Sequence, residues 1–136
     1  MNDVKTIAEY IVNKFYISYR KLLVTLYFVQ AEHLVKTGRP CFSDIIRAEP
    51  DGISIDAIAD IYNIFDEGII PHNRNYIQPK IDNTSIIDSA VKHCQNKSHK
   101  QLIKLIINRE PWKTAYNSPL KEITPGMMLL VYSDKK

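Results

Sequence analysis

The stretch that decides the fold is residues 19–40, YRKLLVTLYFVQAEHLVKTGRP. A stripe of mostly apolar residues recurs in it at steps of three and four, which places the stripe on one face of a helix: Tyr19, Leu22, Leu23, Leu26, Tyr27, Gln30 and Leu34. Gly38 can take the left-handed conformation at little cost, and Pro40 cannot continue a helix. The stretch therefore predicts a long amphipathic helix that ends near Gly38.

The same helical period extends to both sides of this stretch. Further helices are expected at six places: residues 4–15, 55–65, 85–95 and 98–107, and short segments that begin at Pro111 and Pro125. Ser54 is a suitable N-cap for the helix over 55–65, and Ser98 is expected to form a capping box with Gln101.

Two short segments without a helical period are long enough for extended pieces, Asp44–Ala48 and Tyr76–Gln78. The sequence leaves open whether they pair, since a two-stranded ribbon needs support from the rest of the fold. The expected fold class is mainly α. It is a single compact bundle of six or seven helices over residues 1–136, with room for a small β-hairpin.

Composition narrows the class of protein. The chain has 136 residues, of which 45% are hydrophobic and 24% are charged, as in an ordinary globular domain. Its longest apolar stretch falls well short of the roughly 18 residues that a membrane span needs, and its first residues show no secretory signal. Its Cys count of 2, without framework spacing, fits a reducing cytoplasm better than secretion. The sequence therefore predicts one cytoplasmic domain with no membrane partner.

Charge is divided unevenly along the chain. Residues 1–71 hold 7 Lys and Arg against 10 Asp and Glu, a net charge of −3, whereas residues 72–136 hold 11 against 5, a net charge of +6. In the basic part, Lys97, Lys100 and Lys104 lie on or beside one expected helix, as residues that follow phosphates would. A nucleic-acid-binding regulator is therefore an alternative. A solvated lysine face explains the same pattern, so nucleic acid is the less favoured partner.

Residues for catalysis or metal binding are not grouped as those chemistries need. Zinc sites use two pairs of ligands at short spacing, whereas only His93, Cys94 and His99 lie close together in the sequence. Cys41 has no sign of activation, and the 4 glycines are too scattered for a phosphate-binding loop. The sequence predicts no enzyme, no metal and no cofactor.

Three segments together resemble the Panacea domain, also called the SocA-like antitoxin domain. They are residues 21–42, residues 46–65, and residues 105–115 followed by Ile123-Thr124-Pro125. They share with the family pattern a set of polar, aromatic and turn-forming residues: Gln30, His33, Gly38, Pro40, Phe42, Gly52, Tyr62, Pro111 and Trp112. Two tryptophans of the pattern are replaced, one by Glu32 and the other within Ala48-Glu49-Pro50. If those aromatics shape the family's contact surface, the partner or the surface differs here.

The resemblance implies a small, mostly helical, non-enzymatic protein of phages and mobile elements. Such proteins are antitoxins that bind a protein toxin encoded by an adjacent gene, and the SocA type delivers its toxin to a AAA+ protease. We therefore expect an antitoxin-like protein, with a proteolytic adaptor as an alternative. The residues carried over as partner-binding candidates are Tyr27, Gln30, His33, Tyr62 and Trp112. For Gln30 and His33 a second interpretation stays open, as buried polar groups that bond to backbone turns.

Overall fold

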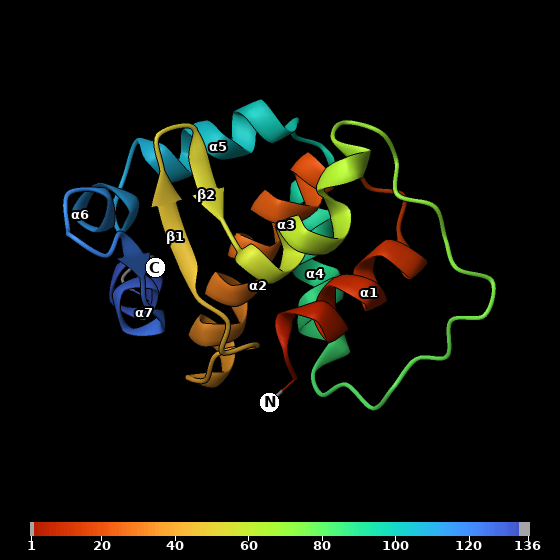
Figure 1. Cartoon of the computed structure of the whole chain (residues 1–136). Helices are drawn as coiled ribbons and strands as arrows, with labels where there is room; N and C mark the ends of the chain where they lie inside the picture. Colours follow the sequence, from red (N-terminus) through yellow and green to blue (C-terminus); the bar gives the residue numbers. More distant parts are fainter. Residues whose placement is uncertain (1, 134–136) are drawn as a thin grey trace.

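The computed structural model describes residues 2–133, which contain seven α-helices, one short 3-10 helix and three short strands (Figure 1). In chain order these are α1 (Val4–Lys14), α2 (Tyr19–Thr37), β1 (Ile46–Glu49), β2 (Gly52–Ser54), α3 (Asp56–Tyr62), η1 (Asn63–Phe65), α4 (Thr84–Gln95), α5 (His99–Ile107), α6 (Trp112–Tyr116), β3 (Glu122–Ile123) and α7 (Pro125–Ser133). The expected fold class, mainly helical with a small hairpin, is confirmed.

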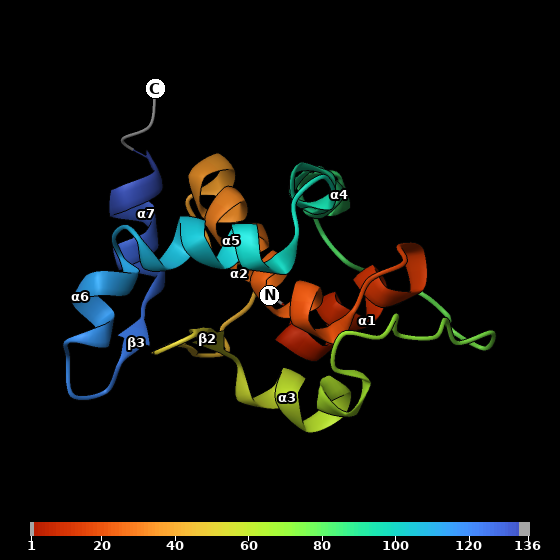
Figure 2. The ribbon, with the colours of Figure 1, turned by 90° about the horizontal axis from the view of Figure 1, so that it is seen from above.

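Helix α2 lies at the centre of the domain, and α1, α4, α5 and α7 pack against it (Figure 2). Leu22 of the predicted stripe is fully buried, but so are residues outside that stripe: Val24, Thr25, Val29 and Ala31. A helix that is largely apolar on all sides is enclosed by other elements. The prediction of one buried face for this helix is therefore wrong, and α2 is the element around which the core forms.

A three-stranded antiparallel sheet has the strand order β2-β1-β3 and contacts α2 through β2. Ala48 of β1 lies opposite Ile53 of β2, and Ile46 lies opposite Ile123 of β3. The extended piece expected at Asp44–Ala48 overlaps β1, but its partner β2 was not expected. Strand β3 was not expected, because two residues are too few to show the alternation that marks a strand.

Several helix ends follow the predicted capping chemistry. Gly38 ends α2 with a φ of 75°, in the left-handed region. Ser98 and Gln101 form the expected capping box at the start of α5, with both hydrogen bonds made. At α7 the Met127 N–H donates to Thr124 Oγ1 over 3.1 Å. These ends are set by local chemistry, which is why the sequence reveals them.

The expected N-cap at Ser54 is wrong. Ser54 belongs to β2, where it lies opposite Arg47, and its hydroxyl donates to Glu49 Oε2 over 2.7 Å. Helix α3 begins one residue later, after Ile55, which offers no side-chain cap. Pairing with β1 thus takes the serine that would otherwise have capped the helix.

The segment between η1 and α4 follows the outside of α1 without regular structure (Figure 1). The Ile70 N–H donates to Ile17 O over 2.9 Å, and the Asn73 N–H donates to Asn13 Oδ1 over 2.7 Å. The extended piece expected at Tyr76–Gln78 is not a strand. It lies where no described strand offers it a partner.

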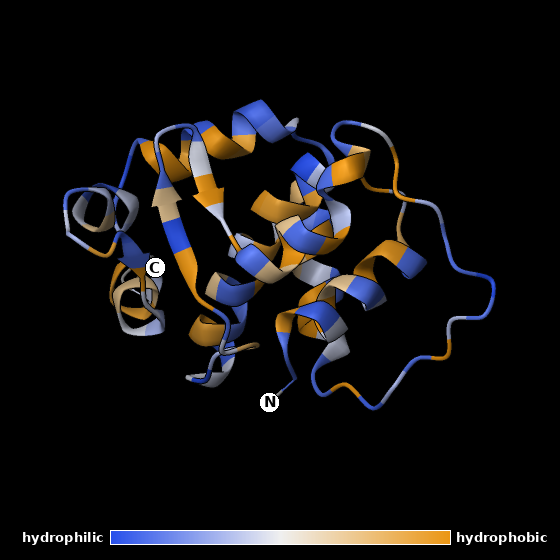
Figure 3. Ribbon diagram, in the orientation of Figure 1, coloured by the Kyte–Doolittle hydropathy of each residue, from blue (hydrophilic) through white to orange (hydrophobic). Residues whose placement is uncertain are grey.

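Apolar and polar residues alternate in bands around α1 and α5, as expected for helices with one face in the core (Figure 3). No helix within residues 2–133 carries an apolar run long enough to cross a membrane.

Candidate functional site

Gln30, one of the predicted site residues, is buried in the second half of α2 and holds the chain that follows the helix. Its Nε2–H donates to Phe42 O over 2.8 Å, and its Oε1 accepts from the N–H groups of Cys41 and Phe42 over 2.7 and 3.3 Å. The amide thus satisfies three backbone groups in a stretch with no regular structure. This arrangement matches the interpretation of Gln30 as a buried polar group that bonds to a turn.

His33, three residues after Gln30 on α2, holds the same stretch of chain that follows the helix. Its Nδ1–H donates to Arg39 O over 2.6 Å, and its Nε2 lies 3.3 Å from Asn83 Nδ2. The ring therefore connects the end of α2 to the start of α4, and it is also buried. We call Gln30, His33 and the backbone of residues 38–42 the turn clamp.

Tyr27 and Tyr62 are buried as well. The Tyr27 hydroxyl lies 2.9 Å from the Tyr132 hydroxyl of α7, and burial raises the pKa of Tyr27. Tyr62 ends α3 with its ring in the core, and burial raises its pKa too. A side chain without exposed surface cannot touch a partner docked on this conformation. Tyr27 and Gln30 therefore support the fold and do not form a contact surface.

Trp112 is partly exposed and lies at the start of α6. Its Nε1–H donates to Gly52 O over 2.7 Å, and its ring stacks on Tyr116 with centroids 4.7 Å apart. This contact joins the β1–β2 hairpin to α6. Gln30 and His33 thus share one junction, whereas Tyr27, Tyr62 and Trp112 lie at other places in the fold, and the structure does not bring the five together as one surface.

The three lysines of the nucleic-acid alternative are exposed but divided between two places. Lys97 lines a groove between helices, whereas Lys100 and Lys104 do not. At about 100° per residue, Lys100 lies on the side of α5 opposite Leu102, which faces the groove.

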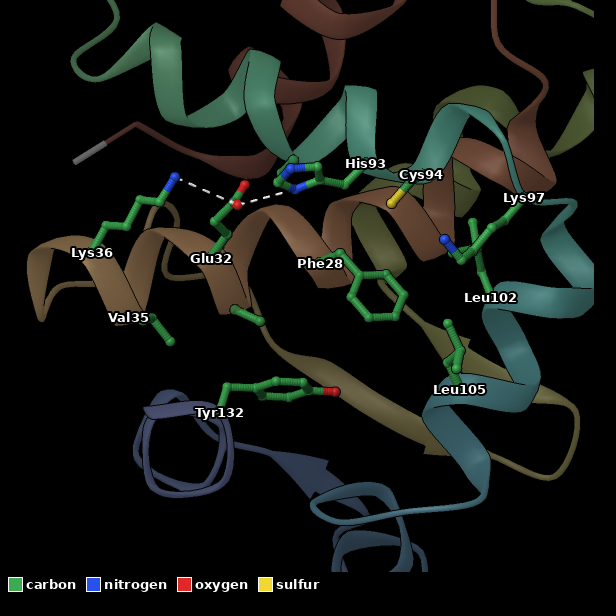
Figure 4. A pocket seen from close by; sticks show the side chains of 12 residues that line it. Phe28, Glu32, Val35, Lys36, His93, Cys94, Lys97, Leu102, Leu105 and Tyr132 are labelled. Atoms are coloured by element: carbon green, nitrogen blue, oxygen red, sulfur yellow. Dashed lines mark ion pairs between the residues drawn. The ribbon is translucent and has the colours of Figure 1, made fainter. Parts of the chain in front are cut away.

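The groove that Lys97 lines lies between α2, α4, α5 and α7 and has a volume of about 340 Å³ (Figure 4). Its walls are mostly apolar: Phe28, Ala31, Val35, Leu102, Leu105 and Tyr132. Val35 and Leu105 are exposed to 45% and 46% although they are aliphatic. We call this feature the apolar groove. No sequence motif marks it, because its walls come from four helices far apart in the chain.

Glu32 lies at one end of the apolar groove and supplies the carboxylate among its lining residues (Figure 4). Its Oε1 lies 3.2 Å from His93 Nδ1 and 3.5 Å from Lys36 Nζ. Its Oε2 is buried and finds no hydrogen-bond donor in the described part of the chain. A buried acceptor without a hydrogen-bond donor is energetically unfavourable. Glu32 is also the residue that replaces a tryptophan of the family pattern.

The cysteines show no activation. Both are buried, and burial raises the pKa of the Cys41 thiol to about 12 and raises the pKa of Cys94 as well. Thiolates, not thiols, are the reactive form, so neither is prepared for nucleophilic attack. Among residues 2–133, no three His, Cys, Asp or Glu side chains lie close enough together to hold a metal ion.

The apolar groove is therefore suited to binding, because it has apolar walls, half-exposed aliphatic side chains and a rim of charged groups.

A scan against protein-family models gives no match to this chain, and searches of curated proteins and of solved structures return no similar protein.

Proposed function

We propose that this protein is antitoxin-like and that it binds and neutralises a protein toxin by direct contact through the apolar groove. The observation that carries the proposal is the apolar groove itself, with Val35 and Leu105 half exposed on facing helices. The three segments that resemble the Panacea domain support a toxin as the class of partner.

The composition of the apolar groove is that of a protein interface. Interfaces have an apolar centre, often aromatic, surrounded by polar and charged residues. Phe28 and Tyr132 supply aromatic surface, and Glu32, Lys36 and Lys97 supply the charged rim.

The turn clamp supports this function indirectly. At about 100° per residue, Gln30 and His33 lie on the side of α2 opposite Phe28 and Val35. By tying α2 to the chain that follows it, they hold the helix whose other side forms a wall of the apolar groove. Gln30 and His33 are thus positioning residues in the proposal, and the groove residues make the contact.

Co-expression tests the proposal. Each neighbouring open reading frame is induced with and without this protein, and colony counts report neutralisation. We expect one neighbour to be toxic and wild-type protein to restore growth. Leu105→Glu should abolish the rescue, because it places a charge in an apolar interface.

Ile64→Glu is the matched control, since Ile64 is 82% exposed and lies on η1, outside the apolar groove. It should rescue growth like wild type at equal protein level, measured by immunoblot. No rescue by wild type with any neighbour would contradict the proposal, and equal rescue by Leu105→Glu would remove the groove from it. The toxin's half-life separates neutralisation from the adaptor alternative: it falls only if the toxin is delivered to a protease.

A further inference from the structure

The apolar groove is bordered by more positive than negative charge, and this defines the chemistry of its occupant. Lys36 and Lys97 line it, and the Arg109 guanidinium lies 4.7 Å from the centre of the Tyr132 ring on its wall. Among the described lining residues Glu32 is the one carboxylate, and it already faces His93 and Lys36.

Lys97 is the rim cation with the most freedom to act on a partner. It is exposed and forms no ion pair with a described carboxylate, whereas Lys36 is shared with Glu32. In Figure 4 its side chain lies beside Leu102, so its ammonium stands at the edge of the apolar walls. An acidic group on a bound partner could therefore pair with the Lys97 ammonium while both charges stay in contact with solvent.

The walls have the spacing that receives a helix. Phe28, Ala31 and Val35 are three and four residues apart on α2, and Leu102 and Leu105 are three apart on α5. Rows of this spacing on two neighbouring helices accept the apolar ridge of a third helix, and an amphipathic helix in such a groove is a common mode of recognition.

We infer that the apolar groove receives an amphipathic helix of a partner protein whose apolar stripe enters the groove and whose flanks are acidic. The inference rests on the proposed function and adds the chemistry of the partner. Glutamates or aspartates of the helix pair with Lys97 and the neighbouring cations.

Nucleic acid fits this surface less well. A phosphate backbone needs a row of cations, whereas Lys100 and Lys104 lie on α5 outside the apolar groove and Lys97 lies within it. Val35 and Leu105 offer nothing to a phosphate. A nucleic-acid strand is therefore an outcome of the test and not the proposed occupant.

Three dye-labelled peptides of about 20 residues, long enough to form a helix, test the inference by fluorescence anisotropy. The first has a leucine stripe at helical spacing flanked by glutamates, the second replaces every glutamate by lysine, and the third interrupts the first with two prolines. A labelled single-stranded DNA is the fourth probe. All are titrated against the full chain at low and at raised salt.

Matched variants locate the binding. Lys97→Glu is compared with Lys100→Glu, and Leu105→Glu with Ile64→Glu. We expect the acidic peptide to bind about tenfold tighter than the other two peptides. Lys97→Glu should weaken it by about threefold to tenfold at low salt, with a smaller effect at raised salt, and Leu105→Glu by at least about tenfold. Lys100→Glu and Ile64→Glu should leave it unchanged. Circular dichroism shows that each variant is folded.

Other outcomes overturn the inference. They are equal or tighter binding of the lysine peptide, no measurable binding of the acidic peptide, equal effects of Lys97→Glu and Lys100→Glu, or DNA binding tighter than peptide binding. The growth assay keeps the two proposals distinguishable. If the peptides fail while Leu105→Glu still abolishes rescue, a toxin binds the groove in another form. If wild type rescues growth against no neighbour while the acidic peptide binds, the inferred occupant of the groove is supported and the proposed antitoxin function is contradicted.

Discussion

The two sides of α2 between Phe28 and Val35 differ in how fully their groups are satisfied. On one side, Gln30 and His33 use their polar atoms on backbone groups of the turn that follows the helix. On the other side, Phe28 and Val35 line an open groove and Glu32 keeps a buried oxygen without a described donor. The comparison teaches that the conspicuous polar residues of this helix serve stability, whereas the proposed contact is made by residues without a signature.

At neutral pH, the largest effect is expected from a variant that breaks the turn clamp. Gln30→Leu keeps the side-chain size but leaves the Cys41 and Phe42 groups buried without partners, at about 1–3 kcal/mol for each group left unsatisfied. We expect the free energy of unfolding to fall by about 3 kcal/mol, measured by urea denaturation with the fluorescence of Trp112. Gln95→Leu makes the same change at an exposed position of α4 and should stay within about 0.5 kcal/mol. Equal losses of stability in the two variants would contradict the stabilising role of the turn clamp.

The second-largest loss of stability is expected where the β1–β2 hairpin packs against α5. Gly52 has a φ of 146°, which side chains rarely adopt, and an added Cβ would lie 3.6 Å from the side chain of Ile103. Gly52→Ala should cost about 2 kcal/mol through backbone strain. Gly126→Ala, in the first turn of α7, has no such strain and should be neutral or stabilising by up to about 1 kcal/mol. Thermal unfolding followed by circular dichroism compares the two.

The free energy of unfolding should also depend on pH through Cys41, which lies in the turn clamp. Burial raises the pKa of Cys41 from 9.0 to about 12, so the folded protein holds the thiol proton more tightly than the unfolded chain does. The resulting stability is fully present below pH 9 and is lost as the pH rises toward 12. Over that range wild type should lose up to about 1.4 kcal/mol per pH unit more than Cys41→Ala. Parallel slopes in urea denaturation at several pH values would show that the thiol does not titrate differently on unfolding.

The smallest effect is expected on the open side. Val35→Gln removes apolar surface from the groove without leaving a buried group unsatisfied, so the free energy of unfolding should change by no more than about 0.5 kcal/mol. The same variant should weaken binding of the acidic peptide by about threefold or more. A large loss of stability would mean that the groove is part of the core, and the contrast between the two sides of α2 would disappear.

Residues that act on their own neighbours in sequence could be predicted. Gly38 and the Ser98–Gln101 box end or start helices through bonds made within one turn, and both behave as expected. Helix α7 likewise begins at Pro125, as expected. Ser54 has the same local chemistry, but β1 competes for it, and the sequence does not show which partner wins.

The candidate site could be predicted only in part. The resemblance singled out Gln30 and His33, and the residues themselves already allowed a turn-supporting role, which the hydrogen bonds to Phe42 and Arg39 match. Phe28 and Leu105 could not be singled out, because an apolar residue on a helix reads as core whether or not another element covers it.

By itself, the sequence determined the helices, most of their ends and the charge difference between the two parts of the chain, because these depend on spacing, capping and composition. Only the tertiary structure decided that α2 is enclosed on nearly all sides, that Glu122 and Ile123 form a third strand, and that four helices leave a groove between them. Each of these depends on contacts between segments far apart in the chain, whose geometry is set by packing and not by any local pattern.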